Sequence, residues 1–212
     1  MPCRGAPLSK QTLEFWFEFA SSYSYLSVMR IEPLARAAGV TLQWRPFLLG
    51  PVFLSLGWND SPFNIYPPKG RYMWRDLARL ASRYGLPLKV PSRFPRNGLL
   101  AARVALAGAD EAWLPAFCRA VMRANFAEDR EIADVEVISA ILASLELPVD
   151  TILARAESPE NKQALRRQTE RASEIGLFGA PSFVTPDGEL FWGNDRLEDA
   201  LEWVNKGGVA AP

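Results

Sequence analysis

The stretch Leu13-Glu-Phe-Trp-Phe-Glu-Phe19, followed by Ala20-Ser-Ser-Tyr-Ser24, decides how the rest of this sequence is interpreted. Its first part is rich in aromatic residues and predicts a buried β-strand. The segment 25–38 predicts an α-helix that ends at Gly39. A tight turn between a strand and a helix exposes backbone N–H groups at the positive end of the helix dipole. This turn is therefore a place where an anion such as a thiolate or a carboxylate could bind.

A second strand is predicted after this helix. The segment 40–47 (Val-Thr-Leu-Gln-Trp-Arg-Pro-Phe) alternates in character as a half-buried strand does. Strand, helix and strand in this order predict a right-handed βαβ unit with two parallel strands. Pro33 lies inside the predicted helix, where proline removes a backbone hydrogen bond. We therefore expect Pro33 to kink the helix or to divide it in two.

The middle of the chain predicts helices joined by segments that contain proline and glycine. Among these joints, the segment 57–69 is long and contains aromatic residues. It either lines a cleft or only connects two helices. The predicted helices are 70–84, 99–107, 111–126, 135–145 and 151–155.

The carboxyl-terminal part returns to a mixture of helices and strands. Pro186-Asp187-Gly188 is a typical turn sequence and predicts a β-hairpin around it. Asn194 or Asp195 is expected to cap the last helix. The predicted elements are a helix over 159–174, strands over 182–185 and 189–192, and an amphipathic helix over 195–206.

The order of these elements predicts the fold class. It is β-α-β at the start and α-β-β-α at the end, which is the order of a thioredoxin-like α/β fold. The helices between the two parts then form a large all-α helical insertion. We expect a thioredoxin-like domain made of 12–50 and 162–206, a helical insertion domain over 51–161, and flexible tails at 1–11 and 207–212.

Composition excludes several classes of function. The 24 Lys and Arg balance the 24 Asp and Glu, so no basic excess indicates a nucleic-acid partner. Histidine is absent, which rules out Ser-His-Asp and Cys-His catalysis within the chain. Cys3 and Cys118 form no Cys-x-x-Cys pair, so neither a redox pair nor a metal site is expected. No segment predicts a signal peptide or a membrane span, and we expect a cytoplasmic protein.

Three motifs converge if the chain has this fold. Ser21 stands at the turn where dithiol proteins of this fold have cysteine; its hydroxyl could donate a hydrogen bond to a bound thiolate, or could only cap the helix. Ala180 precedes Pro181 and would offer its backbone N–H and C=O to an extended peptide, unless Pro181 only marks the start of a strand. Trp192-Gly-Asn-Asp195 leads into the last helix, where its polar groups suit an ammonium and a carboxylate, or again only a cap.

Glutathione is the common thiol that matches all three motifs. It is an extended tripeptide with a thiol, an ammonium and two carboxylates. Ser21 would face its sulfur, Ala180 its backbone, and the segment 192–195 its γ-glutamyl end. The sequence therefore predicts a glutathione site in which the protein holds a thiolate that is not its own.

Several stretches also match a known family in its order. They are Phe-Glu-Phe-Ala-Ser-Ser-Tyr-Ser-Tyr-Leu (17–26), Trp-Arg-Pro-Phe-Leu-Leu-Gly (44–50), Pro-Lys-Gly-Arg-Tyr-Met (68–73), Phe-Gly-Ala-Pro-Ser-Phe-Val (178–184) and Trp-Gly-Asn-Asp-Arg-Leu (192–197). Through them the sequence resembles the 2-hydroxychromene-2-carboxylate isomerases and their relatives, the kappa-class glutathione transferases. Both belong to the DsbA-like branch of thioredoxin folds. The matching stretches span nearly the whole chain.

This resemblance implies a role for particular residues. Ser21 would be the catalytic serine that activates glutathione, and the thiolate would add to an unsaturated aromatic acid, allow rotation about the bond, and leave again. A homodimer is expected by resemblance only. The implied glutathione-binding residues are Ser21, Ala180, Pro181, Trp192, Gly193, Asn194 and Asp195, and the implied substrate residues are Asn59, Asn64, Ile65, Lys69 and Asn97.

Two departures from the family keep other functions open. Ser22 stands where the family usually has proline, and no lysine follows Leu48-Leu-Gly50, where the family often has one for the substrate carboxylate. Lys69 or Arg71 could substitute for that lysine. The leading hypothesis is a glutathione-dependent isomerase. The alternatives are a kappa-like transferase that conjugates electrophiles and a non-catalytic protein of thioredoxin fold that binds a peptide across Pro181.

Overall fold

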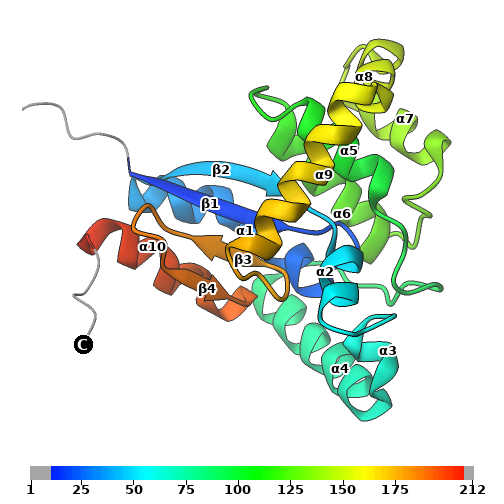
Figure 1. The fold of residues 1–212 in the computed structure, drawn as a ribbon. Helices are drawn as coiled ribbons and strands as arrows, with labels where there is room; N and C mark the ends of the chain where they lie inside the picture. Colours follow the sequence, from blue (N-terminus) through cyan, green and yellow to red (C-terminus); the bar gives the residue numbers. More distant parts are fainter. Residues whose placement is uncertain (1–10, 208–212) are drawn as a thin grey trace, which may run out of the picture.

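A computed structural model describes residues 11–207, which contain a four-stranded mixed sheet with helices around it (Figure 1). The strand order is β2-β1-β3-β4; β1 pairs with β2 in parallel and with β3 antiparallel, and β3 pairs with β4 antiparallel. This confirms the predicted α/β fold of thioredoxin type. The strands are β1 (Thr12–Phe17), β2 (Thr41–Pro46), β3 (Ser182–Val184) and β4 (Leu190–Trp192).

Helices make up most of the rest of the described structure. Between β2 and β3 all elements are helical, as predicted, and Figure 1 shows α5 to α8 grouped at one end of the sheet. The predicted tails lie outside the described residues, apart from Gln11 and Gly207. The helices are α1 (Ser22–Ala38), α2 (Leu49–Ser55), α3 (Pro62–Ile65), α4 (Pro67–Tyr84), α5 (Leu99–Ala107), α6 (Leu114–Phe126), α7 (Val135–Ser144), α8 (Val149–Glu157), α9 (Pro159–Glu174), the 3₁₀ turn η1 (Asn194–Arg196) and α10 (Leu197–Lys206).

The aromatic residues of β1 divide between the two faces of the sheet. Side chains alternate along a strand, so Phe15 and Phe17 point to one face and Trp16 to the other. Phe15 and Phe17 belong to a core cluster that includes residues of α1 and α10, whereas Trp16 packs with Phe47 and with Ala172 of α9. The helices α1 and α10 therefore cover one face of the sheet, and α9 covers the other.

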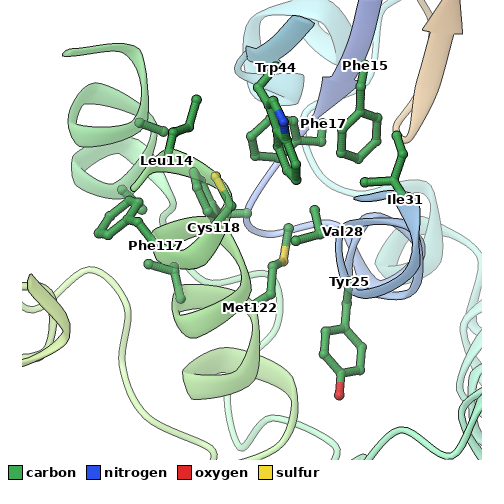
Figure 2. Packing of buried hydrophobic residues seen from close by; sticks show 14 of the residues in the cluster. Phe15, Phe17, Tyr25, Val28, Ile31, Trp44, Leu114, Phe117, Cys118 and Met122 are labelled. Atoms are coloured by element: carbon green, nitrogen blue, oxygen red, sulfur yellow. The ribbon is translucent and has the colours of Figure 1, made fainter. Parts of the chain in front are cut away.

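The larger core cluster continues from the sheet into the helical part. Phe15, Phe17 and Trp44 share this cluster with Phe117 and Met122 of α6, and Figure 2 shows Phe17 and Trp44 beside Cys118 of the same helix. The rings of Phe15 and Trp44 meet edge to face with centroids 5.2 Å apart. The predicted burial of Cys118 in a helix is confirmed in the same cluster. The sheet and the helices inserted between β2 and β3 are thus held by one continuous apolar core.

One prediction about the helices was wrong in part and another was wrong. Pro33 does not divide α1, because the apolar side of the helix, with Ile31 and Ala35 among others, is buried on both sides of the proline; a kink at Pro33 stays a prediction. Neither Asn194 nor Asp195 caps the last helix: both lie in η1, and α10 begins after Arg196 without a side-chain cap. Within residues 11–207, no helix is both long and apolar enough to cross a membrane.

The helices α2 and α3 lie in segments where no helix was predicted. Gly50 and Pro51 look like helix breakers, but both fall in the first turn of α2, where a backbone N–H has no partner within the helix. The same holds for Pro62 at the start of α3, which Ser61 caps by accepting a hydrogen bond from the Phe63 N–H at 3.3 Å. The sequence prediction assigned these two segments to loops because of Pro51 and Pro62, which instead lie in the first turns of helices.

Candidate active site

A large cavity opens beside the turn that joins β1 to α1. Its volume is about 1150 Å³, and it is walled by the start of α1, by α2 and the segment after it, by the residues before α5, and by the loops before β3 and α10. The segments that line it include 20–23, 48–51, 58–63, 94–99, 178–180 and 192–196. The segment 57–69, for which both a lining and a connecting role were considered, thus supplies part of the wall.

Ser21 lies at the edge of the cavity and caps α1. Its hydroxyl accepts a hydrogen bond from the Ser24 N–H at 3.2 Å and donates one to the Ala180 carbonyl at 2.9 Å. Capping is therefore one role of Ser21, as serine at this position commonly has. The second bond has no part in capping, because it reaches from the start of α1 to the loop before β3. Ser21 thus stands where the first two predicted motifs meet.

The loop before β3 presents Ala180 to the cavity beside two aromatic residues, Phe178 and Trp192. The Ala180–Pro181 peptide bond is cis, and Ala180 lines the cavity whereas Pro181 does not. Trp192 packs edge to face on Phe178, with ring centroids 4.8 Å apart, and remains 51% exposed. A Cβ atom on Gly179 would lie 2.4 Å from the Trp192 ring nitrogen, so only glycine lets this indole pack here. The pair forms an aromatic wall beside Ala180.

In the third motif, the side chain of Asn194 is buried and that of Asp195 is exposed. Asn194 is 2% exposed; its Oδ1 accepts hydrogen bonds from Ser27 and Arg30, and its Nδ2 donates to the Tyr84 hydroxyl. Its side chain is therefore committed to the protein and anchors the loop. The Asp195 side chain, by contrast, is 71% exposed at the cavity. Gly193, which precedes Asn194, has φ of +111°, which favours glycine.

The predicted substrate residues are only partly brought together. Asn59, Lys69 and Asn97 line the cavity, and Asn64 and Ile65 do not. The amide of Asn64 instead donates to the Asp60 carboxylate and to the Phe94 carbonyl, so it ties α3 to the segment before α5. Asn97 uses its Oδ1 to accept the Leu99 N–H at 2.9 Å. Arg71, considered as a substitute for the family's lysine, does not line the cavity.

Ser22 occupies the first residue of α1, the position that suits a proline. Its hydroxyl is buried and donates to the Met73 sulfur of α4 at 3.0 Å. The departure from the family's proline is therefore accommodated by a contact with α4, and the turn keeps its helix start.

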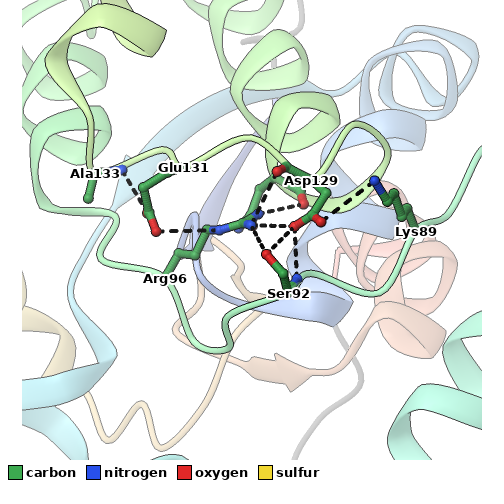
Figure 3. A network of polar contacts seen from close by, with 7 residues as sticks. Lys89, Ser92, Arg96, Asp129, Glu131 and Ala133 are labelled. Atoms are coloured by element: carbon green, nitrogen blue, oxygen red, sulfur yellow. Dashed lines mark hydrogen bonds and ion pairs between the residues drawn. The ribbon is translucent and has the colours of Figure 1, made fainter.

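Arg96 is a cation at the cavity whose charge is already used. Its guanidinium donates to Asn125, to Ser92 and to Asp129, and Glu131 lies 3.7 Å from its Nε (Figure 3). Hydrogen bonds from the Ser92 N–H and from Arg96 hold the pKa of Asp129 below its usual range. Because Asn125 also donates to the Phe19 carbonyl at 3.0 Å, this network fastens the segment before α5 to the turn between β1 and α1, which is called the active turn below.

Glu18 is a carboxylic residue of the cavity that sequence reasoning missed. It directly follows β1, is 5% exposed, and accepts the Leu49 N–H at 2.9 Å and the Ala20 N–H at 3.4 Å. Burial raises its pKa to about 7, although the hydrogen bonds from Leu49 and Ala20 act in the opposite direction. The signal was an acidic residue directly after an aromatic strand and next to the turn. Within residues 11–207 no cluster of His, Cys, Asp and Glu suits a metal ion.

Comparisons with known proteins agree with this fold. Residues 12–204 match the family model of the DSBA-like thioredoxin domain. The chain is 30% identical to a 2-hydroxychromene-2-carboxylate isomerase of Sphingobium xenophagum over 89% of its length and 95% of that protein, and 24% identical to the glutathione S-transferase kappa 2 of Caenorhabditis elegans over 92% of each. A solved structure of a 2-hydroxychromene-2-carboxylate isomerase superposes with a TM-score of 0.81 at 27% identity, covering 92% of this chain and 95% of that one.

Proposed function

Because the chain belongs to the DsbA-like thioredoxin family, within the group of 2-hydroxychromene-2-carboxylate isomerases and kappa-class glutathione transferases, we propose that this enzyme activates glutathione at Ser21 to isomerise an unsaturated aromatic acid. One observation carries the proposal. The Ser21 hydroxyl bonds the Ala180 carbonyl at the edge of a cavity large enough for a tripeptide and a second small molecule.

The bond between Ser21 and Ala180 suggests how glutathione switches the serine. An extended peptide that pairs with the loop before Pro181 donates a backbone N–H to the Ala180 carbonyl. That N–H takes the place of the Ser21 hydroxyl, which then turns its proton to the glutathione sulfur. The turn keeps its cap, because the same oxygen still accepts the Ser24 N–H. Ligand binding thus releases the hydrogen-bond donor that the thiolate needs.

The expected size of this effect matches what the chemistry requires. A hydrogen bond to a charged group contributes about 1.5–3 kcal/mol. Since about 1.4 kcal/mol corresponds to one pKa unit, the Ser21 hydroxyl lowers the pKa of the bound thiol by about one to two units. An ordinary thiol has a pKa of about 8.5, so the pKa of the bound thiol falls to about 6.5–7.5 and a substantial fraction is ionised near neutral pH. No protein base is needed to hold the thiolate once it has formed.

Other cavity residues are assigned to the γ-glutamyl end of glutathione and to the carboxylate of the substrate. Asp195, which is exposed at the cavity and lies 3.4 Å from the Arg196 guanidinium, accepts the γ-glutamyl ammonium, whereas the Asn194 side chain only holds the loop. Lys69 is the cation for the substrate carboxylate, since Arg96 is paired with Asp129 and Arg196 with Asp199. The thiolate adds to the double bond of the acid, the resulting single bond rotates, and elimination regenerates glutathione. Reduced glutathione goes with a reducing compartment such as the cytoplasm.

A kappa-like transferase is the second candidate. It is favoured by the match to a kappa transferase and by the absence of the family's lysine after Leu48-Leu-Gly50. In that case the thiolate attacks an electrophile and the adduct leaves. Incubation with candidate substrates separates the two: an isomerase leaves the amount of free glutathione unchanged, and a transferase consumes it. A homodimer stays a prediction in either case.

The proposal is tested by titrating the enzyme with glutathione across pH and following the ultraviolet absorbance of the thiolate. We expect Ser21→Ala to raise the pKa of the bound thiol by about one to two units and to lower turnover by about 10- to 100-fold. The matched control is Ser158→Ala, because Ser158 caps α9 by accepting the Asn161 N–H at 3.2 Å far from the cavity wall. Both variants lose about 1 kcal/mol of stability, and only the first changes the thiol. A bound thiol in the unaltered enzyme with its ordinary pKa would refute the activation mechanism.

A further inference from the structure

The Glu18 carboxyl is a titratable group of the cavity to which the proposed function gives no role. It lies between β1, the start of α2 and the residue before α5, and it lines the same cavity as Ser21. The Ser21 N–H donates to the backbone carbonyl of Glu18 at 3.0 Å, so both residues belong to one turn. A carboxyl this deeply buried normally has a cation beside it or is neutral.

No cation holds Glu18 ionised. Within residues 11–207 its carboxylate forms no ion pair, and the groups that alter its pKa are burial and backbone N–H donors. The cations that line the cavity are Lys69, Arg96 and Arg196, and the other carboxylates are Asp60, Asp76 and Asp195; none of them forms a hydrogen bond with Glu18. Its two hydrogen bonds to N–H groups favour the charged form, and its burial favours the neutral form. The carboxyl is therefore balanced between the two states.

The absence of a side chain at Gly98 leaves the space that the Glu18 carboxyl occupies at the cavity. A Cβ atom on Gly98 would lie 2.7 Å from Glu18 Oε1, so any other residue at position 98 would push the carboxyl away. Gly98 itself is held by the segment that Arg96 fastens to Asn125, and Asn125 donates to the Phe19 carbonyl. The position of the carboxyl relative to the active turn is thus fixed from two sides.

We propose that the Glu18 carboxylate takes up the proton that the glutathione thiol loses on binding and returns it when the thiol re-forms. This inference rests on the proposed function and adds to it the fate of the proton. The S–H bond breaks and an O–H bond forms on Glu18, directly or through one water molecule, so that no net charge enters the cavity. A like charge disfavours ionisation of its neighbour, and the new thiolate therefore strengthens the hold of Glu18 on the proton.

The reverse transfer completes the cycle. When elimination releases the glutathione sulfur from the substrate, Glu18 gives its proton back to the leaving thiolate or to the product oxygen. No oxidant, reductant or further reactant is required. The group can do this near neutral pH because burial raises its pKa to about 7.

The test counts protons. Glutathione is added to the enzyme in weak buffer at about pH 8, where Glu18 is mostly ionised and free glutathione mostly a thiol. An indicator dye measures protons released, and ultraviolet absorbance measures thiolate formed. We expect the unaltered enzyme to release far less than about one proton per new thiolate, and Glu18→Gln to release about one. The matched control Glu14→Gln removes a carboxylate of β1, four residues before Glu18, that pairs with Arg45 and Arg171, and it should behave as the unaltered enzyme.

The outcomes separate this inference from the proposed function. If both proteins form thiolate and release equal numbers of protons, Glu18 is not the acceptor and the activation by Ser21 still stands. If the unaltered enzyme forms no thiolate, both proposals fail. Should Glu18→Gln fail to fold, the infrared difference spectrum of the unaltered enzyme with and without glutathione decides: a protonated carboxyl signal that grows on binding supports the transfer, and its absence overturns it.

Discussion

At the scale of single residues, the Ser21 hydroxyl joins two parts of the chain that are 159 positions apart. It accepts a bond from its own helix and donates one to the loop before β3. A cysteine there would be a protein thiol. Under the proposed function, the serine hydroxyl instead faces a sulfur atom that comes with the ligand.

Glu18 makes the stability of the enzyme depend on pH. Its pKa is about 7 in the folded protein and about 4.5 when the side chain is in water, so between these values the folded state keeps a proton that the unfolded state has lost. The free energy of unfolding therefore falls as pH rises from 4.5 to 7, by about 3 kcal/mol from this group, and its contribution is constant above pH 7. Urea unfolding of the unaltered protein and of Glu18→Gln at about pH 5 and about pH 8 measures the difference.

This difference is easy to attribute, because the chain has no histidine to titrate in the same interval. Glu18→Gln should lose the fall in stability and be the more stable of the two proteins above pH 7. Equal pH dependence in both proteins would show that the carboxyl is no more buried in solution than in the unfolded chain.

Sequence reasoning located the candidate site better than it assigned side chains within it. Ser21, Ala180 and the segment 192–195 were predicted from turn chemistry, and all of them line one cavity. Asn64 was assigned from its place in the chain, but on the short helix α3 its side chain turns to Asp60. The direction of a side chain on such a short helix depends on tertiary packing, which the periodicity of the sequence does not reveal. Glu18 was overlooked because one charge after an apolar strand is usually at the surface.

At the scale of elements, helices with a clear apolar period were predicted almost to the residue. The helices α5 and α9 have the predicted bounds, and the βαβ unit has its parallel pair. The helices α2 and α3 were not predicted, because they are short and have proline or glycine in the first turn. The helix α2 contacts α9, which lies far along the chain, whereas α3 contacts α4, which directly follows it. Local sequence carries little information about the first of these contacts.

The first turn of α1 allows a stabilising substitution at Ser22. The first position of a helix does not need its N–H, and Ser21 before it has φ −82° and ψ 120°, which a following proline permits. Ser22→Pro should therefore raise the free energy of unfolding by about 0.4–1 kcal/mol through the unfolded chain, less the small loss of the hydrogen bond to Met73. Thermal unfolding measures the gain, and glutathione activation should be retained.

Ser24→Pro is the matched control for this substitution. Ser24 lies within the same turn, but its N–H donates to Ser21 Oγ, so proline there removes a bond and should destabilise the protein. A destabilised or inactive Ser22→Pro would mean that the contact with Met73 of α4 matters more than the entropy of the turn.

At the scale of the whole molecule, the order of the chain and the packing of the core divide the protein differently. The proposed domains, 12–50 with 162–206 and 51–161, follow the order of strands and helices. The apolar core crosses that division, since Phe15 and Phe17 of β1 share a cluster with Phe117 and Met122 of α6. The turn before α1 and the segment before α5, which both line the cavity, are attached to this shared core.

We expect the two parts of the chain to unfold together. Met122 is fully buried in the shared core, so Met122→Ala should lower the free energy of unfolding by about 2–5 kcal/mol. Because the sheet loses its support along with α6, hydrogen exchange in β1 and in α7 should accelerate by the same factor under conditions where global unfolding dominates. The control Val135→Ala changes a residue that is 51% exposed and should leave both rates nearly unchanged. Faster exchange confined to the helices between β2 and β3 would show instead that they form a unit that opens on its own, and the cavity would then be bounded by a wall that can part from the sheet.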